Sequence, residues 1–600
     1  MDSRTHPPLR GRYSLALQML VTAILFAACA KSPSSTDAPV APATGAAAAT
    51  PTPASAEILP GDTLPRKYTP KPTSTAITPG DLMSRVYLFA DDSMMGRRTG
   101  TAGGEKGTAY IAAELRRLGA TPAGENGTFF QAVPIVRRLF DTTSSVAVDG
   151  STLRWWTDFG AVRPQRFLRR SLDGVQAIYG GTLSQDTTAL PSVAQMRGKL
   201  VVFTLPAPPA GTPAQLPLVS FQAAPRFSEA AGVALVGWEH ASTPLVDFLR
   251  NPSFALRADS PPGTGPITLF LTTAAATKVL GADPSTLKAG AIGKTLRGAV
   301  VLQQTQAPAR NVIAIFPGTD AALRAQYVAL GAHSDHVGFT GTPVDHDSLR
   351  AFNAEVQRLK HANGGTQPSA AAQAQIRVNV DSLRRIRPAR IDSVNNGADD
   401  DASGSMGLLE VAEFFADAAN RPKRSLLFVW HDSEEIGLVG ARWFTDNPTV
   451  PRDSIVGQLN VDMIGRGMPS DLPEGKPGYI QLLGSRRLST EYGDIVEQVG
   501  AASPVPFTFD YQFDAPNHPE QYYCRSDHYM YARYGIPVVF LSTGDHVDYH
   551  QVTDEPQYIN YAQLARVSTF LKDLAVRFGN LDHRVAIDKP KPDPQGQCRQ

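Results

Sequence analysis

Cysteine is scarce in this chain, which has only Cys29, Cys524 and Cys598 among its 600 residues. No Cys-x-x-Cys motif and no Cys/His cluster occurs, so a thiolate metal site is excluded and any metal must bind carboxylates and imidazoles. Net charge is also small, at +1, and gives no indication of a nucleic-acid partner or an acidic surface. In an oxidising compartment Cys524 and Cys598 can form a disulfide, but the sequence does not decide this.

The N-terminus has the order of a secretory signal peptide: three arginines precede the apolar stretch YSLALQMLVTAILF, and AACAKS follows. The stretch is too short for a stable transmembrane helix. Ordinary signal peptidase would cleave at Ala-Cys-Ala, whereas FAAC resembles a bacterial lipobox in which Cys29 becomes the lipidated first residue. We expect the lipoprotein form, because a flexible tract follows the cysteine. The protein is then either lipid-anchored in the bacterial cell envelope, at the outer membrane or in the periplasm, or secreted.

The chain divides by composition into several segments. Residues 1–29 are the predicted signal peptide, and residues 30–77, rich in Pro, Ala, Thr and Ser, predict a disordered linker. Folded sequence begins near residue 78, and 78–165 is the first part of a main domain. Between 166 and 302, short β-rich runs such as GKLVVFTLP and GVALVGW are separated by Pro and Gly, which indicates an inserted, mostly-β module.

Residues 303–575 contain the main part of an α/β domain. Continuous apolar runs such as SLLFVW alternate with amphipathic segments such as SGSMGLLEVAEFFADAA. This pattern predicts a mainly parallel, mixed sheet flanked by helices. A charged stretch, 343–394, interrupts the alternation, and we interpret it as a surface insertion that forms helices rather than as an active-site lid. Residues 576–600 are a C-terminal tail.

Polar residues follow the predicted buried strands, at the edge of an open α/β sheet where ligands gather. Two histidines and three or four carboxylates without thiolates suit zinc or a similar divalent ion. They are too many for one catalytic zinc, and they suit two metals that share one carboxylate. These residues are His333 and Asp335 after YVALGA, Glu434 and Glu435 after LLFVW, Asp462 in LNVDMIG, Tyr549 and His550 after PVVFLSTGDHVD, and Asp400 before a helix.

The run of three aspartates, 399–401, has two other interpretations. Acidic residues are favoured at a helix start, so the run can be a solvated N-terminus. With Ser403, Gly404 and Glu410 its spacing is also close to a calcium-binding EF-hand loop. The calcium interpretation is weaker, because Pro388 and an Asn-Asn-Gly stretch predict an irregular approach instead of the entering helix.

Five ordered blocks carry a resemblance: GAHSDH, GADDDASG, HDSEEIGLVG, NVDMIG and SDHYMYARYGIPVVFLSTGDHVDYH. They resemble the co-catalytic dizinc metallopeptidases, which include bacterial leucyl aminopeptidases, glutamate carboxypeptidase II and glutaminyl cyclases. The match covers roughly 76–165 and 303–575, and the insertion resembles a protease-associated domain through MRGKLVVFTLP and AAGVALVGW. The resemblance implies a zinc exopeptidase fold, two zinc ions per chain and peptide substrates.

The resemblance also implies a role for each matched residue. Asp400 would bridge both zinc ions, because the family's bridging aspartate stands three residues before a Ser-Gly pair. The sequence departs from the family pattern at two places. The 343–394 insertion lengthens the spacing between His333 and Asp400, and Ala441 stands where many relatives have Ser. The remaining roles are His333 and Asp462 on one zinc, Glu435 and His550 on the other, Asp335 as the partner that orients His333, Glu434 as general base and Tyr549 as the oxyanion donor.

The activity that the resemblance implies is that of an aminopeptidase, the commonest activity among relatives with this arrangement. A carboxypeptidase or dipeptidase is the second alternative. A glutaminyl cyclase is third, because those relatives work with one zinc and this chain retains the residues for two. A non-catalytic receptor that uses the β-rich insertion is the fourth, although such proteins are expected to lose ligands or the base, and none is missing here. Substrate side-chain preference and oligomeric state stay open.

Overall fold

The structure is a computed structural model, and it describes residues 64–600 except 165–166, 184–189, 208–213, 215, 219–220, 222–223, 258–264 and 386. The predicted signal peptide and most of the predicted linker lie outside these residues. The last part of that linker was predicted wrongly, because Leu64, Tyr68 and Ile77 pack against the main core and Thr73 bonds Glu413. Within the described part of the chain, no helix is both long and apolar enough to cross a membrane.

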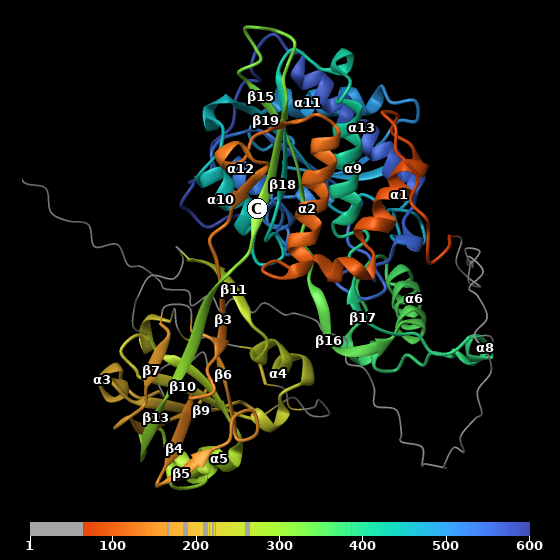
Figure 1. The fold of residues 1–600 in the computed structure, drawn as a ribbon. Coiled ribbons are helices and arrows are strands. Elements are labelled where there is room, and N and C mark those ends of the chain that lie inside the picture. Colours follow the sequence, from red (N-terminus) through yellow and green to blue (C-terminus); the bar gives the residue numbers. More distant parts are fainter. Residues whose placement is uncertain are drawn as a thin grey trace, which may run out of the picture.

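A mixed sheet forms the centre of the main domain (Figure 1). Its four central strands are mutually parallel, while the strands on either side of them run antiparallel. This arrangement confirms the predicted fold class. In spatial order the strands are β1 (Thr121–Pro122), β14 (Arg310–Phe316), β18 (Ser425–His431), β15 (Tyr327–His333), β19 (Ile455–Val461), β22 (Val538–Ser542), β20 (Tyr479–Leu483) and β21 (Thr508–Asp510), with β2 (Phe130–Ala132) also on β14.

Helices cover both faces of this sheet, which explains its continuous apolar strands. All seven residues of β18 are buried: Phe428 and Trp430 face one core, and Leu427 and Val429 face the other. The first core includes α1 (Pro79–Phe89), α2 (Ala102–Arg117), α9 (Ala402–Phe414), α11 (Thr490–Ala501) and α13 (Tyr561–Gly579), and the second includes α10 (Val439–Asp446) and α12 (His528–Ala532).

Among the described residues, eleven strands form a second sheet, in the lower lobe of Figure 1. It begins at Ile135, earlier than the boundary predicted at residue 166, because β3 pairs antiparallel with the end of the long strand β13. The alternation in IVRRLF is weak, so the sequence did not reveal this pairing. The strands are β3 (Ile135–Phe140), β4 (Ser145–Val148), β5 (Ser151–Leu153), β6 (Phe159–Val162), β7 (Arg169–Ser171), β8 (Gln176–Thr182), β9 (Leu200–Thr204), β10 (Gly232–Val236), β11 (Ser253–Leu256), β12 (Ile267–Leu271) and β13 (Ile292–Ala307), with helices α3 (Val193–Met196), α4 (Thr243–Arg250) and α5 (Thr273–Leu280).

The predicted surface insertion contains helices, as expected. A two-stranded sheet joins its two ends, so the inserted unit extends from residue 338 to residue 395 and is longer than the predicted 343–394. We call residues 338–395 the insertion segment. Its elements are β16 (Gly338–Asp345), α6 (His346–Ala362), α7 (Ala370–Gln373), α8 (Asp381–Arg384) and β17 (Ile391–Asn395).

The C-terminal tail is attached to the main domain by a disulfide and by hydrogen bonds of its last residue. Cys524 and Cys598 form a disulfide, which answers the question that the sequence left open. The side chain of Gln600 also accepts a hydrogen bond from the backbone N–H of Tyr523 and donates to the carbonyl of Phe513.

Candidate active site

The carboxyl ends of the central strands bring the predicted site residues together. His333 is the last residue of β15, Asp462 follows β19 directly, and Glu434 and Glu435 lie just after β18. Asp400 precedes α9, and its neighbour Asp401 is the N-cap of that helix. These residues thus lie together at the carboxyl edge of the sheet, where the positions after the predicted strands had placed them.

Asp400 lies between the two halves of this cluster. Its Oδ1 is 3.1 Å from His333 Nε2, and its Oδ2 is 3.0 Å from His550 Nε2. On the first side His333 Nε2 is 3.4 Å from Asp462 Oδ1, and on the second side His550 Nε2 is 2.9 Å from Glu435 Oε2. One carboxylate thus presents one oxygen to each half, which is the arrangement that two metals with a shared ligand require.

His336 is a further member of the second half, and it was missed from the sequence. Its Nδ1 is 2.8 Å from Glu435 Oε1 and 3.6 Å from Asp400 Oδ2, and the side chain is fully buried. It lies in the block GAHSDH, of which only His333 and Asp335, nearer the strand end, were predicted as site residues. A second imidazole three residues after His333 in one short loop was the available signal.

The three consecutive aspartates have three different roles. Only Asp400 points between the histidines. Asp401 Oδ1 accepts from the backbone N–H groups of Gly404 and Met463, and its Oδ2 accepts from that of His333, so this carboxylate joins three segments at the site. Asp399 Oδ1 accepts from the N–H of Gly465.

A calcium loop is not formed at these aspartates. Glu410, which such a loop would need as a ligand, bonds Arg85 Nε at 2.8 Å within the core. Both carboxylate oxygens of Asp401 and one of Asp399 accept from backbone N–H groups, and Asp399 Oδ2 lies 3.2 Å from His546 Nε2. The alternative interpretation of the run as an EF-hand loop is therefore wrong.

The carboxylate of Asp335 has closer partners than His333, which it was predicted to orient. His333 Nδ1 lies 3.1 Å from the backbone carbonyl of Asp335 and 3.8 Å from its carboxylate, so the carbonyl is the closer partner of the ring. The carboxylate instead accepts from the N–H of Glu434 at 3.0 Å, from that of Glu435 at 3.4 Å and from the Thr99 hydroxyl at 2.9 Å. Asp335 therefore positions the two glutamates.

The two adjacent glutamates have opposite electrostatic environments. Burial, followed by the negative charges of Glu435 and Asp462, raises the pKa of Glu434 well above its usual value. Burial and Asp400 also act to raise the pKa of Glu435, but His550 and His336 outweigh them and lower it to about 2. One carboxyl is thus adapted to hold a proton and the other to stay ionised, which is typical of a division between base and ligand.

Tyr549 lies against the second half of the site. Its ring stacks on His550, with 3.8 Å between ring centroids. Burial and the nearby carboxylates, Asp400 first among them, raise the pKa of Tyr549 well above 10. The phenol therefore keeps its hydrogen and can donate it.

The cluster fits a metal centre. Among the described residues, buried His336 Nε2 has no hydrogen-bond partner, and the short contacts of Asp400 Oδ2 and His550 Nε2 lack hydrogen-bond geometry. Donor atoms within 4.8 Å of one another form two groups, and their carboxylate and imidazole chemistry suits zinc. The groups are His336, Asp400, Glu435 and His550, and His333, Asp401 and Asp462.

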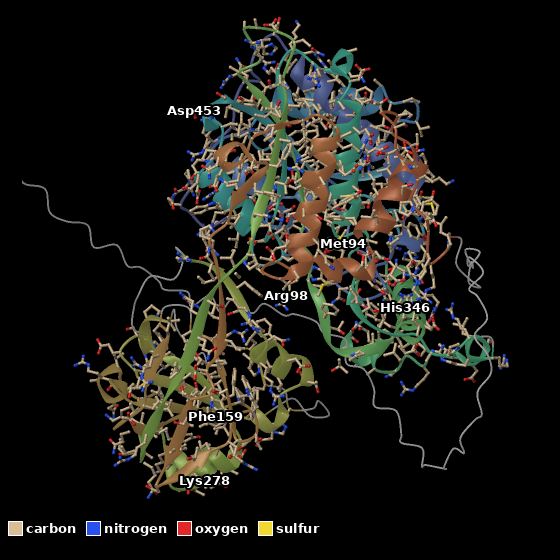
Figure 2. The ribbon with its side chains drawn as sticks, viewed as in Figure 1. Met94, Arg98, Phe159, Lys278, His346 and Asp453 are labelled. Atoms are coloured by element: carbon tan, nitrogen blue, oxygen red, sulfur yellow. A yellow bond between two sulfur atoms is a disulfide. The ribbon has the colours of Figure 1, made fainter. Side chains whose placement is uncertain are left out.

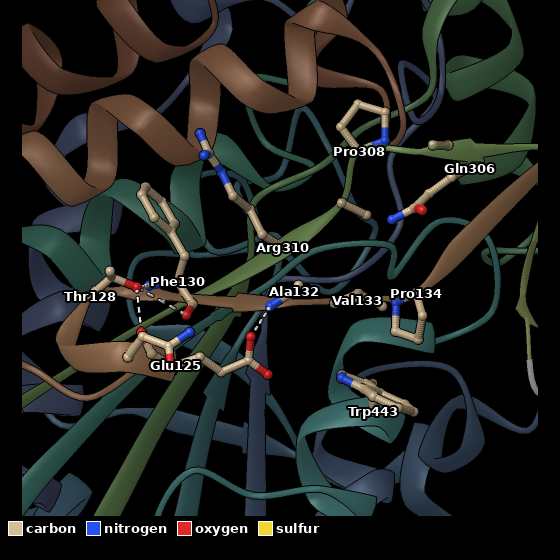
Figure 3. Close-up of a pocket in the computed structure, with 13 residues that line it drawn as sticks. Glu125, Thr128, Phe130, Ala132, Val133, Pro134, Gln306, Pro308, Arg310 and Trp443 are labelled. Atoms are coloured by element: carbon tan, nitrogen blue, oxygen red, sulfur yellow. Dashed lines mark hydrogen bonds between the residues drawn. The ribbon is translucent and has the colours of Figure 1, made fainter.

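A separate hollow of about 490 Å³ lies where the two connections between the sheets pass each other (Figure 3). Val133 and Pro134 line it on one connection, Pro308 on the other, and Trp443 closes one side. None of the candidate ligands reaches it, so it is distinct from the metal cluster.

Comparisons with known proteins give a family match and several partial relatives. Residues 311–575 match the family model described as Peptidase family M28. Leupeptin-inactivating enzyme 1 from Streptomyces exfoliatus is 30% identical over 172 residues, which are 28% of this chain and 34% of that protein. An aminopeptidase from Pseudomonas aeruginosa strain UCBPP-PA14 is 32% identical over 136 residues, 20% of this chain and 24% of that protein. The chain thus spans about a third or less of these curated relatives.

Two solved structures resemble the chain at low identity. One is an aminopeptidase from Aneurinibacillus sp. strain AM-1, with 14% identity, coverage of 86% of this chain and 97% of that one, and a TM-score of 0.45. The other is BSAP, a zinc aminopeptidase from Bacillus subtilis, with 13% identity, coverage of 87% and 100%, and a TM-score of 0.43. The family match confirms the resemblance predicted from the five sequence blocks.

Proposed function

We propose that this chain, whose residues 311–575 match the model of peptidase family M28, is a zinc-dependent aminopeptidase. The observation that carries the proposal is the Asp400 carboxylate, which faces His333 with one oxygen at 3.1 Å and His550 with the other at 3.0 Å. His333 and Asp462 would hold one zinc, Glu435 and His550 the second, and Asp400 both. When bound, the two zinc ions lower the pKa of a water and polarise the scissile carbonyl.

Glu434 is the proposed general base. It takes a proton from the attacking water and returns it to the leaving amine. Desolvation of this half-buried side chain and its carboxylate neighbours raise its pKa, which makes it a better proton acceptor than an exposed glutamate. Asp335 holds the backbone of Glu434 and Glu435, so each keeps its own direction at the end of β18.

Tyr549 is the proposed donor to the oxygen of the scissile carbonyl. Its stacking on His550 places the phenol beside the second half of the site. A donor that meets developing negative charge in a buried site contributes about 3 to 4 kcal/mol to the lowering of the barrier. Tyr549 stays protonated, because burial and nearby carboxylates raise its pKa.

Export and lipid attachment at Cys29 are part of the proposal. The signal-like N-terminal sequence supports them, and the disulfide between Cys524 and Cys598 suits an oxidising compartment. We further propose that the second sheet, from Ile135 to Ala307, is the protease-associated-like domain that the sequence suggested.

Digestion of a peptide library by zinc-loaded protein tests the proposed activity. Aminoacyl-nitroanilides and peptides with free amino termini should be cleaved, and N-blocked dipeptides should not. Glu434→Gln is the control, since it should lose cleavage and keep its zinc. Cleavage of the blocked dipeptides alone would overturn the aminopeptidase in favour of a carboxypeptidase or dipeptidase, and a fully active Glu434→Gln protein would overturn the base.

A further inference from the structure

The insertion segment packs against the loop that carries Tyr549 and His550, which we call the 543–555 loop. Its helix α6 starts at His346, labelled in Figure 2 below the main domain. Asn353 is 3% exposed, and its Nδ2, which has two hydrogens to donate, lies 3.0 Å from Asp548 Oδ1, 3.0 Å from Gln551 Oε1 and 3.1 Å from Thr553 Oγ1. One buried amide thus contacts the loop on both sides of its two functional residues.

Two arginines of the insertion segment extend this contact. The Arg350 guanidinium pairs with Asp548 and lies 3.8 Å from the ring centroid of Tyr558. Arg390, just before β17, donates from Nη1 to Glu555 Oε2 at 2.8 Å. The loop is therefore held near its middle and at its end by side chains from one inserted segment.

The 543–555 loop has a backbone that needs such support. His550 has φ of +57°, a left-handed conformation that a non-glycine residue keeps only where its surroundings fix it. The N–H of Gln551 bonds the carbonyl of Asp548 at 3.0 Å, so this short turn sets where Tyr549 and His550 point. At the end of the loop, Asp554 accepts from the backbone N–H of Asp400 at 3.1 Å.

The contact face of α6 is polar. Arg350, Asn353 and Gln357, at spacings of three and four, all face the main domain, and Gln357 Nε2 donates to the carbonyl of Asp471 at 2.6 Å. The outer face carries Glu355 and Arg358, which pair with each other. Because hydrogen bonds rather than a broad apolar stripe fix α6, its docking is directional and suits positioning.

We propose that the insertion segment is a positioning element of the active site, in which Arg350 and Asn353 fix Asp548 and Gln551 and thereby place Tyr549 and His550. The inference rests on the proposed function for the roles of Tyr549 and His550, and on the structure alone for the contacts. It gives a function to a segment that the sequence showed only as a surface insertion.

Arg350→Ala and Arg358→Ala form a matched pair on the same helix. Arg350 faces the loop, whereas the Arg358 side chain is 63% exposed and pairs with Glu355 on the outer face of the helix. We would measure amide hydrogen exchange of peptides covering 546–555 in the full-length protein, together with kcat and KM on the best substrate. Arg350→Ala should exchange about tenfold faster in this loop and lose about tenfold in kcat with little change in KM, since small misplacements of reacting groups lower the rate. Arg350→Lys should restore part of both.

Asn353→Ala is the second variant, and it should give the same two effects. Faster exchange and lower kcat in the Arg350 and Asn353 variants, with Arg358→Ala unchanged, supports the positioning role. Unchanged exchange in the loop, or equal effects of Arg350→Ala and Arg358→Ala, overturns it. Failure of the proposed function is seen separately, because the unmodified protein would then cleave none of the peptides while the exchange comparison still gives its answer.

Discussion

Replacing Asp335 by asparagine should disable Glu434 and Glu435 without removing a candidate ligand. Asp335 is 1% exposed, and its carboxylate accepts from the N–H of Glu434 at 3.0 Å, the N–H of Glu435 at 3.4 Å and the Thr99 hydroxyl at 2.9 Å. Asparagine keeps one acceptor oxygen and puts a donating amide in place of the other. In Asp335→Asn, therefore, at least one buried donor faces another donor.

The size of the effect follows from these contacts. A buried donor left without its acceptor costs about 1–3 kcal/mol. Loss of a residue that orients metal ligands typically lowers metal affinity or activity about 10- to 100-fold. Asp335→Asn should thus unfold at lower denaturant concentration and lose about 10- to 100-fold in kcat/KM.

Asp432→Asn is the matched control for this substitution. The Thr99 hydroxyl lies 2.9 Å from Asp335 Oδ2 and 2.7 Å from Asp432 Oδ1, yet it has only one hydrogen to donate. Burial and the charge of Asp335 raise the pKa of Asp432 to about 7, so below that pH the protonated acid can supply the second hydrogen. Asparagine has the same donor and acceptor as this protonated acid, and at pH 6 Asp432→Asn should behave almost like the unmodified protein.

The same pair predicts a pH effect with a definite sign. Because the folded-state pKa of Asp432 is raised, its stabilising contribution is fully present below about pH 4 and is lost as pH rises through 7. Asp432→Asn should remove this part of the pH dependence. Denaturant unfolding between pH 4 and 8 and kcat/KM at pH 6 provide the assay. Equal losses in both variants, or none in Asp335→Asn, would refute the reasoning.

Three further predictions concern stability and the oxyanion donor. Replacing Cys524 and Cys598 by serine opens a loop with a sequence separation of 74, and should cost at most about 4 to 5 kcal/mol by chain entropy, as read from urea unfolding. Arg85→Met leaves the buried Glu410 carboxylate without its 2.8 Å partner and should cost about 3–5 kcal/mol, again by urea unfolding; an unchanged midpoint would contradict it. Tyr549→Phe should lower kcat about 100-fold and leave KM and zinc content unchanged, whereas an equal rise in KM would argue against a transition-state role.

Much of the site could be predicted from the sequence because charged residues directly follow the apolar runs of the buried strands there. Asp462 follows a buried strand, and Glu434 and Glu435 follow SLLFVW, whose residues face two cores in alternation. Burial makes an unpaired charge costly, so polar residues at such positions indicate partners elsewhere. The choice of Asp400 among three aspartates needed the family resemblance, and the structure supplies the physical difference: Asp399 and Asp401 bond backbone N–H groups.

Other features could not be predicted because they depend on contacts far apart in the chain. The carboxylate of Asp335 faces Thr99 and Glu434, and no local pattern distinguishes this from a bond to His333. In the sequence, Asn353 is an ordinary polar residue of a charged segment. Only the folded structure shows that it is buried against Asp548. Polar networks of this kind leave no periodicity for a sequence argument to find.

The number of zinc ions per chain tests the central claim most directly. Protein loaded with zinc and freed of unbound metal should contain two ions per chain, and Asp400→Ala should lose zinc, because its carboxylate faces both halves of the site. A single zinc in the unmodified protein, or two retained by Asp400→Ala, would contradict a centre built on that shared carboxylate.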